Sequence, residues 1–265
     1  MKPANHSMPI RQRPRIHTLG LHALFGLAGL FGLLLAPAAH SNEALALMYY
    51  ERPPFMMDST DASGTVSVNG ISADPSAAAM KAAGLPFRWH KFGAKRIMEI
   101  IQENSLAACG VGWFKTAERE QYAKFSRPIY RDKPWVALTP KKFTLPANTT
   151  IASLLTNKDN RILVKENFTY GGLDLLMQKA QSTRISTTAE ISQMVQMIKA
   201  NRADIMFLAD EEASYLLEQG GFRASDFNLV RFPDMPKGIL RYFMCSKKVP
   251  DEVIQKLNAV IRFEG

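Results

Sequence analysis

The sequence has little of the side chains that carry metal or nucleophilic chemistry. Its 265 residues include two cysteines and five histidines, and four of the histidines lie within the first 41 residues. After residue 41 only His90 remains, and the chain contains no H-x-x-x-H pair, no paired cysteine motif, no G-x-S-x-G elbow and no P-loop. The sequence therefore gives little support to metal, hydrolytic or nucleotide chemistry, and we expect His90 to be structural.

Apolar runs long enough to cross a bilayer are also missing. The run from Ala23 to Leu35 has 13 residues, whereas a membrane-spanning helix needs about 20. Four basic residues and no acidic one come before it: Lys2, Arg11, Arg13 and Arg15. Small residues follow as far as Ser41, a pattern typical of a secretory signal peptide. We expect cleavage near Ser41 and a periplasmic location, with an uncleaved amphiphilic anchor as the alternative.

Charge of one sign does not cluster in this chain. Residues 1–41 hold four of the 33 Lys and Arg residues and none of the 24 Asp and Glu residues, so their removal lowers the net charge from +9 to +5. The pairs Lys141-Lys142 and Lys247-Lys248 lie beside apolar segments as solvated ends. Because there is neither a basic stripe nor an interleaved aromatic pattern, the sequence does not support nucleic-acid binding.

Residues 42–265 alternate short apolar segments with helix-like stretches, which is typical of βα units stacked into mainly parallel sheets. The expected strands are 44–50, 86–90, 106–112, 135–139, 161–164, 204–208 and 240–246. The expected helices are 75–83, 94–103, 151–155, 173–180, 189–200, 211–219 and 251–263, and a polar loop or hairpin is expected at 58–70. The length after residue 41 suits one large domain or two lobes of about 110 residues each.

Two motifs stand out in the first half of the chain. Lys115-Thr116-Ala117-Glu118-Arg119 is followed by Phe125-Ser126-Arg127-Pro128-Ile129-Tyr130, and Pro53-Pro54-Phe55 comes soon after the first strand. These motifs resemble the T-x-E-R…F-S-x-P-Y and Y-P-P-F motifs of bacterial periplasmic solute-binding proteins of the polar amino-acid type, which are distantly related to glutamate-receptor ligand-binding domains. Over residues 44–263 the resemblance rests otherwise on the order and spacing of elements.

The resemblance implies a two-lobed α/β fold of the type II periplasmic-binding-protein kind. In that fold each lobe is a mainly parallel sheet flanked by helices, and the lobes close on a ligand by hinge motion. Lobe 1 is expected at 42–132 and 237–265, and lobe 2 at 133–236, with crossings near 131–134 and 232–238. The match ends at Gly265, before the final helix that the family usually has.

The resemblance also implies a set of ligand-binding residues. In the family the arginine of T-x-E-R grips the ligand's carboxylate and the threonine donates to it; a guanidinium suits this task because its planar fork matches two carboxylate oxygens. We therefore expect Arg119 and Thr116 to contact ligand, with Thr116 also capping a helix. The other candidates are Trp113, Phe114, Tyr50, Arg52, Thr169, Tyr170 and Asp210. The alternatives are a solvated Arg119, aromatic residues in the core, and an ordinary helix cap at Thr169-Tyr170.

Three positions depart from the family's pattern. The aromatic residue before Pro-Pro is Arg52 here, and the serine that precedes the threonine is Phe114. The aspartate that binds the ligand's ammonium group falls on Ala209, with Asp210 one step beyond. If Asp210 takes that role, the ligand is an α-amino acid. If Arg52 faces the cleft, two arginines favour an acidic or otherwise anionic ligand, and we prefer this second hypothesis.

The two cysteines lie in apolar, strand-like segments. This context favours buried free thiols at Cys109 and Cys245. An even pair in an exported chain also permits a disulfide. Because the resemblance places both strands in the same lobe, the pairing stays open at this point.

The function expected from the sequence is capture of a small carboxylate-bearing solute, an amino acid or organic acid, by lobe closure. The protein would act as a monomer, without catalysis, cofactor or metal, and would deliver the solute to an ABC-type permease or a sensor. One alternative is a periplasmic cyclohexadienyl-type dehydratase on the same fold, with Glu51, Asp210 or Glu211 as the proton-transfer group. The other is a sensory or scaffold pair of lobes whose pocket is degenerate.

Overall fold

The computed structural model describes residues 44–60, 62–64, 66–166 and 168–263. In these ranges the chain forms two α/β lobes, each built around its own sheet, and a separate two-stranded hairpin. The predicted signal peptide at 1–41 lies outside the described residues. None of the helices in the described ranges has both the length and the apolar character that a membrane span requires.

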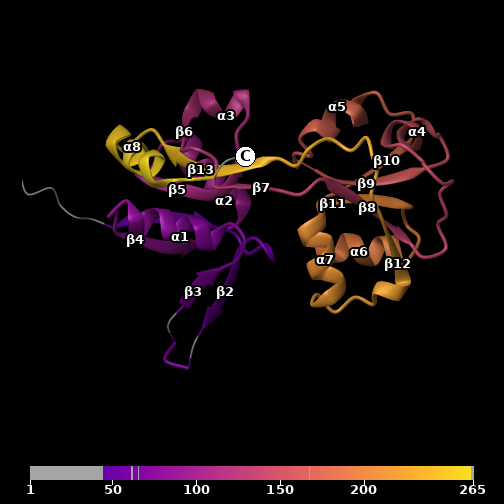
Figure 1. The fold of residues 1–265 in the computed structure, drawn as a ribbon, viewed down its shortest axis with the longest axis horizontal. Helices are drawn as coiled ribbons and strands as arrows, with labels where there is room; N and C mark the ends of the chain where they lie inside the picture. The colour runs from indigo at the N-terminus through magenta and orange to yellow at the C-terminus, as the bar shows by residue number, and fades with distance from the viewer. Residues whose placement is uncertain (1–43, 61, 65, 167, 264–265) are drawn as a thin grey trace, which may run out of the picture. The chain divides into compact units, whose positions relative to one another are not determined.

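Lobe 1 is the part of the chain around a six-stranded sheet of order β4-β1-β5-β13-β6, in which β7 also pairs with β13. Its strands are β1 (Leu45–Tyr49), β4 (Phe87–Lys91), β5 (Ala108–Phe114), β6 (Ala123–Phe125), β7 (Tyr130–Arg131) and β13 (Leu240–Ser246). Its helices are α1 (Ala73–Ala82), α2 (Ala94–Gln102), α3 (Ala117–Tyr122) and α8 (Asp251–Val260). β1, β4 and β5 are parallel, and β13 is antiparallel to its three partners. In Figure 1 the yellow elements β13 and α8 therefore lie with the indigo N-terminal ones.

Helices cover both faces of the lobe 1 sheet, which explains why the central strands β1 and β5 are apolar along their whole length. Successive side chains of a strand point to opposite faces. Leu47 of β1 belongs to a core cluster that includes Met80 of α1 and Leu257 of α8. The next residue, Met48, belongs to the cluster that includes Ile97 of α2. Burial on both faces is the usual environment of parallel strands.

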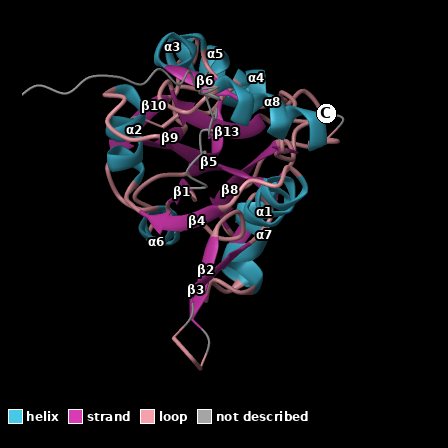
Figure 2. Cartoon of the chain, turned by 90° about the vertical axis from the view of Figure 1, so that its left-hand side faces the viewer, coloured by secondary structure: helices cyan, strands magenta, loops and turns pink. Residues whose placement is uncertain are grey.

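The hairpin of β2 (Met57–Thr60) and β3 (Val66–Asn69) fills the region predicted as loop or hairpin. Its two strands are antiparallel, and the hydroxyl groups of Ser59 and Ser67 lie 2.8 Å apart across them. Figure 2 shows the hairpin extending away from the sheet of lobe 1.

Lobe 2 is the part of the chain around a five-stranded sheet of order β10-β9-β11-β8-β12. The strands are β8 (Trp135–Pro140), β9 (Arg161–Lys165), β10 (Thr183–Thr187), β11 (Ile205–Ala209) and β12 (Phe227–Val230). The helices are α4 (Ile151–Thr156), α5 (Gly172–Gln178), α6 (Ile191–Lys199) and α7 (Asp210–Glu218), with a 3₁₀ turn at Ala224–Asp226. β9, β10 and β11 are parallel, whereas β8 is antiparallel to β11 and β12. A core cluster on one face of this sheet includes residues of α6. The cluster on the other face includes residues of α4 and α5.

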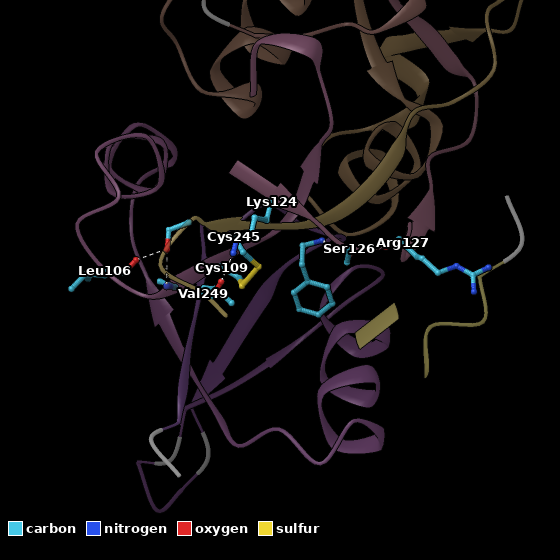
Figure 3. The surroundings of a disulfide bond; sticks show 10 residues. Leu106, Cys109, Lys124, Ser126, Arg127, Cys245 and Val249 are labelled. Atoms are coloured by element: carbon cyan, nitrogen blue, oxygen red, sulfur yellow. Dashed lines mark hydrogen bonds between the residues drawn. A yellow bond between two sulfur atoms is a disulfide. The ribbon is translucent and has the colours of Figure 1, made fainter. Parts of the chain in front are cut away.

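Cys109 and Cys245 form a disulfide in the core of lobe 1 (Figure 3). The expectation of two free thiols is therefore wrong. The two residues are direct partners in the antiparallel pair of β5 and β13, and their Cα atoms lie 3.9 Å apart. They are separated by 136 residues in sequence, so only the return of the last strand to lobe 1 brings them together.

Two segments join the lobes and lie side by side. The backbone N–H of Asp132 donates to the carbonyl oxygen of Ile239 over 2.9 Å, and the Arg131 side chain donates to the carbonyl oxygen of Gly238 over 3.2 Å. A Cβ atom at Gly238 would lie 1.6 Å from the carbonyl oxygen of Asp132, so this approach requires glycine. The lobe limits at 132/133 and 236/237 stay a prediction.

Candidate functional site

The candidate residues of lobe 1 gather at the carboxyl ends of β1 and β5. Tyr50 and Arg52 follow β1, and Trp113 and Phe114 are the last two residues of β5. Open α/β sheets place their ligands at this edge. The rings of Tyr50 and Trp113 meet edge to face, with centroids 5.9 Å apart, so these strand ends form one continuous wall.

A bulge at Gly112 sets the direction of the end of β5. The register between β5 and β13 shifts between Tyr242 and Phe243, so that Gly112 has no partner of its own. Gly112 has a φ of +77°, a left-handed conformation that glycine adopts without strain. Its carbonyl oxygen accepts a hydrogen bond of 2.9 Å from Arg241, which links the bulge to a buried cation.

The T-x-E-R motif lies just after this strand end. Thr116 is the N-cap of α3, and its Oγ1 accepts a hydrogen bond from the backbone N–H of Arg119 at 3.2 Å. The Arg119 guanidinium donates to the carbonyl oxygen of Phe114 over 2.7 Å and lies 5.2 Å from the centroid of the Trp113 ring. Both Thr116 and Arg119 are half-buried. We expected the Arg119 guanidinium to hold ligand, and one of its arms is already bound to the Phe114 carbonyl oxygen.

Arg52 forms a buried ion pair that joins the two lobes. Its Nε and Nη2 atoms donate to Oε1 and Oε2 of Glu212 in α7, each over 2.8 Å, which is a bidentate geometry. Arg52 and Glu212 are 8% and 2% exposed. Burial by itself would lower the pKa of Arg52, but the attraction of Glu212 outweighs it and raises that pKa well above its ordinary range. Arg52 is therefore a permanent cation at this position.

Aromatic rings from both lobes enclose the Arg52 guanidinium. Its central carbon lies 5.4 Å from the ring centroid of Phe55 in lobe 1 and 5.0 Å from that of Phe168 in lobe 2. Its Nη1 is 3.5 Å from the hydroxyl oxygen of Tyr50. These contacts restrict access of water to the ion pair with Glu212, and the faces of the rings attract the cation.

A second carboxylate from α7 meets lobe 1 beside the ion pair. Oε1 of Glu211 accepts hydrogen bonds from the Tyr130 hydroxyl over 2.6 Å and from the backbone N–H of Lys133 over 2.7 Å. Oε2 of Glu211 is buried and has no hydrogen-bond partner among the described residues. Burial and the bond to Glu211 raise the pKa of Tyr130. We call this region the lobe junction: Arg52, Tyr130, Phe168, Glu211 and Glu212.

A further buried ion pair lies where the first crossing segment, near residues 131–134, meets lobe 1. The guanidinium of Arg241 holds both carboxylate oxygens of Asp132, one of them over 2.7 Å, and the two residues are 3% and 1% exposed. The central carbon of Arg241 lies 3.9 Å from the ring centroid of Phe55 and 4.7 Å from that of Phe114. Burial raises the pKa of Asp132, and the charge of Arg241 partly offsets this rise.

Little open space remains beside these side chains. A cavity of about 10 Å³ lies between Arg52 and Arg241, enough for about one water molecule. The Ser72 hydroxyl lines this cavity and has no hydrogen-bond partner among the described residues. A larger hollow of about 790 Å³ is lined by β12 and the loop after β8, within lobe 2.

Tyr170 and Asp210, two of the three candidates of lobe 2, have partners within their own lobe. Tyr170 is buried in the core, where its hydroxyl oxygen accepts a hydrogen bond of 2.9 Å from the backbone N–H of Lys165, and burial raises its pKa to about 12. Thr169 beside it is half-buried. Asp210, the first residue of α7, pairs with Arg231. The ligand-binding roles of all these candidates stay predictions.

Sequence reasoning named several of the residues that meet here and missed others. It named Arg52 as a candidate site residue and Glu211 as a candidate proton-transfer group. It did not name Phe168, Glu212, Asp132 or Arg241. Glu212 had a usable signal, because it follows a strongly apolar strand and so falls at the carboxyl edge of its sheet. Asp132 and Arg241 had none, since they are 109 residues apart.

Comparisons with known proteins are informative at the level of structure. No protein-family model matches the sequence, and no curated protein matches it. A solved substrate-binding protein of an amino acid ABC transporter is 16% identical, with 83% of this chain and 92% of that chain covered and a TM-score of 0.63. The periplasmic VFT2 domain of Bordetella pertussis BvgS is 18% identical, with 81% and 85% covered and a TM-score of 0.64.

An L-arginine-bound substrate-binding protein of an amino acid ABC transporter from Streptococcus pneumoniae is 18% identical, with 83% of this chain and 87% of that chain covered and a TM-score of 0.60. Identities this low show the fold and leave the ligand open. The described part of the chain thus has the two-lobed type II fold shared by amino-acid substrate-binding proteins and Venus flytrap domains.

Proposed function

We propose that this chain is a periplasmic solute-binding protein that captures a small carboxylate-bearing solute between its lobes. The observation that carries the proposal is the Arg52 guanidinium, which is buried at the lobe junction and binds a carboxylate with two hydrogen bonds. A group that binds Glu212 in this way is suited to the carboxylate of a free solute. Export removes residues 1–41, and an ABC-type permease or a sensor receives the loaded protein.

The charges around the junction favour an acidic or otherwise anionic solute. Arg52 and Arg119 lie on the same wall of lobe 1, connected through the rings of Tyr50 and Trp113. Asp210, the candidate partner for an ammonium group, pairs with Arg231. We therefore propose that an α-amino group is not required for binding.

A second candidate function is a sensory pair of lobes with a degenerate pocket. The cavity of about 10 Å³ and the ion pair between Arg52 and Glu212 favour it, because protein groups already fill the place of a solute. The likeness to the BvgS VFT2 domain is compatible with both functions. Whether the purified protein binds a solute distinguishes the two functions.

Mass spectrometry of small molecules that copurify with the mature protein is the first test of solute capture. Calorimetric titration follows, with L-glutamate, succinate and L-arginine as probes. We expect an acidic probe to bind and Arg52→Ala to weaken it by at least tenfold, since a bidentate pair is lost. Arg119→Lys should also weaken binding by at least tenfold without lowering the Tm.

Two results would contradict solute capture as the function of this protein. If neither copurified material nor any acidic probe binds, solute capture fails and the degenerate-pocket function takes its place. If a cyclohexadienyl acid such as prephenate is turned over, the protein is a dehydratase. In that case Glu211 is the first carboxylate to substitute, because it is buried at the lobe junction with one oxygen unpaired among the described residues.

A further inference from the structure

We infer that the Glu212 carboxylate occupies the position on Arg52 that a solute's carboxylate would take, as a tethered substitute for the solute. We also infer that this pair holds the two lobes together when no solute is bound. The closure itself needs only the contacts between the lobes. The further step, in which a solute carboxylate displaces Glu212, rests on the proposed function.

The Arg52–Glu212 pair is bidentate and buried. Glu212 lies in the first turn of α7 in lobe 2, and both its oxygens bind one guanidinium of lobe 1 over 2.8 Å. Its side chain is 3% exposed and that of Arg52 is 9% exposed. Charges attract more strongly where water is excluded, and removal of one partner leaves the other buried without compensation.

The carboxylates near Glu212 bind partners of a different kind. Asp210 pairs with Arg231 inside lobe 2, and Asp132 pairs with Arg241 beside the crossing segment. Glu211 accepts hydrogen bonds from the neutral Tyr130 hydroxyl and from the backbone. Among these four carboxylates, Glu212 alone pairs with a cation of the opposite lobe.

Neighbouring contacts hold both Arg52 and Glu212 in place. Glu211 binds the Tyr130 hydroxyl of lobe 1 and the backbone N–H of Lys133 in the first crossing segment, which holds the first turn of α7 in place. Phe55 and Phe168 enclose Arg52 from the two lobes. Opening the lobes therefore breaks the Arg52–Glu212 pair, the Tyr130–Glu211 bond and the contact with Phe168. A solute has to supply a carboxylate to Arg52 in exchange for Glu212. A neutral solute lacks the group that can replace Glu212 on Arg52.

Distance measurements between spin labels test the closure directly. Labels are attached to cysteines that replace Lys95 in lobe 1 and Leu175 in lobe 2, both exposed. The mature protein is unfolded and refolded so that bound solutes are removed. The comparison is between the unsubstituted junction, Glu212→Gln and the control Glu218→Gln, which changes an exposed residue on the same helix.

We expect a single short distance for the unsubstituted junction and for Glu218→Gln, and a longer, broader distribution for Glu212→Gln. If Glu212→Gln folds poorly, the double variant Arg52→Gln/Glu212→Gln removes both charges, leaves none unpaired and should also open. The inference is overturned if the refolded protein is as open as the variants, or if both variants keep the short distance.

Calorimetry with L-glutamate and succinate separates this inference from the proposed function. If a solute displaces Glu212, Glu212→Gln should bind an acidic probe at least tenfold more tightly than the Glu218→Gln control. If no probe binds any variant while the distances respond as expected, solute capture fails and the tethered closure stands. If probes bind to a protein that is open without solute, the tethered closure fails and solute capture stands.

Discussion

Two arginine–carboxylate pairs dominate the centre of this protein, and they differ in what they connect. Arg241 and Asp132 link a strand of lobe 1 to the first crossing segment. Arg52 and Glu212 link the two lobes. Both guanidinium groups lie over the ring of Phe55. Buried charges are costly unless they are paired. The position of each guanidinium is therefore fixed by its own carboxylate.

Replacement of Arg241 should be strongly destabilising. Arg241→Met leaves Asp132, which is 1% exposed, as a buried carboxylate without its cation. We expect the free energy of unfolding to fall by about 3–5 kcal/mol, measured by urea denaturation at neutral pH. The double variant Arg241→Met/Asp132→Leu removes both charges and should recover most of this loss. A single variant within 1 kcal/mol of the unsubstituted protein would contradict this account.

At the level of the elements, the turn from β11 into α7 places three acidic residues in the first turn of a helix. Negative charge is favourable there because the helix dipole is positive at its N-terminus. The sequence Asp210-Glu211-Glu212 looks uniform, yet the three carboxylates bind different partners. Their roles depend on the positions of Arg231, Tyr130 and Arg52, which belong to other elements.

The pair of Arg161 and Asp204 connects the starts of β9 and β11 and should give an acid-dependent stability. Burial by itself would raise the pKa of Asp204, but hydrogen bonds from the Arg161 side chain and backbone lower it below 3.8. The folded state then binds this proton less readily than the unfolded state. Asp204 therefore stabilises the fold above about pH 3.8, and this contribution is lost as pH falls through the lowered pKa.

Urea denaturation of Asp204→Asn at several pH values checks this dependence. At pH 6 we expect a loss of about 1 kcal/mol, a modest figure because the Arg161 side chain is 40% exposed and screened. The loss should shrink steadily below about pH 3.8. Asp159→Asn, at an exposed position of the same lobe, is the control and should show no such trend. A deficit that stays constant with pH would rule out the role of the Asp204 charge.

Elements with a strong apolar signal were predicted closely. β11 is buried along its whole length, and α6 has its buried apolar residues on one face. Both were predicted within two residues of their bounds. β10 and β12 were missed because they are the edge strands of their sheet and largely exposed or half-buried. An edge strand contacts apolar neighbours less, so its sequence carries a weaker pattern.

At the scale of the whole molecule, the disulfide closes a loop that contains all of lobe 2. Cys109 and Cys245 are 136 residues apart, and the chain-entropy model gives about 4–5 kcal/mol for a loop of this size. We expect reduction, or the double variant Cys109→Ala/Cys245→Ala, to lower the free energy of unfolding by about 3–5 kcal/mol. Reductant should leave the stability of the double variant unchanged. Equal stability with and without the bond would refute this expectation.

The close approach of the two crossings should make Gly238 intolerant of any side chain. A Cβ there would meet the carbonyl oxygens of Asp132 and Lys133, and backbone cannot move aside as a flexible side chain can. We expect Gly238→Ala to lower the free energy of unfolding by at least about 2 kcal/mol. The control is Gly93→Ala, where nothing lies within 4 Å of the added atom. Similar Tm values for the two variants would count against a tight crossing.

The sequence by itself determined the α/β class and most of the elements, because apolar periodicity and turn residues act over short distances along the chain. The two-lobed type II fold was implied by the resemblance of its motifs. The sequence also named Arg52 as a candidate, because Arg52 stands before Pro53-Pro54, where the resembled family contacts its ligand. Only the tertiary structure decided which groups meet there. The disulfide, the Arg241–Asp132 pair and the Arg52–Glu212 pair join residues 136, 109 and 160 positions apart. Such contacts depend on how strands from distant parts of the chain pair and how two lobes meet, which a local pattern does not encode.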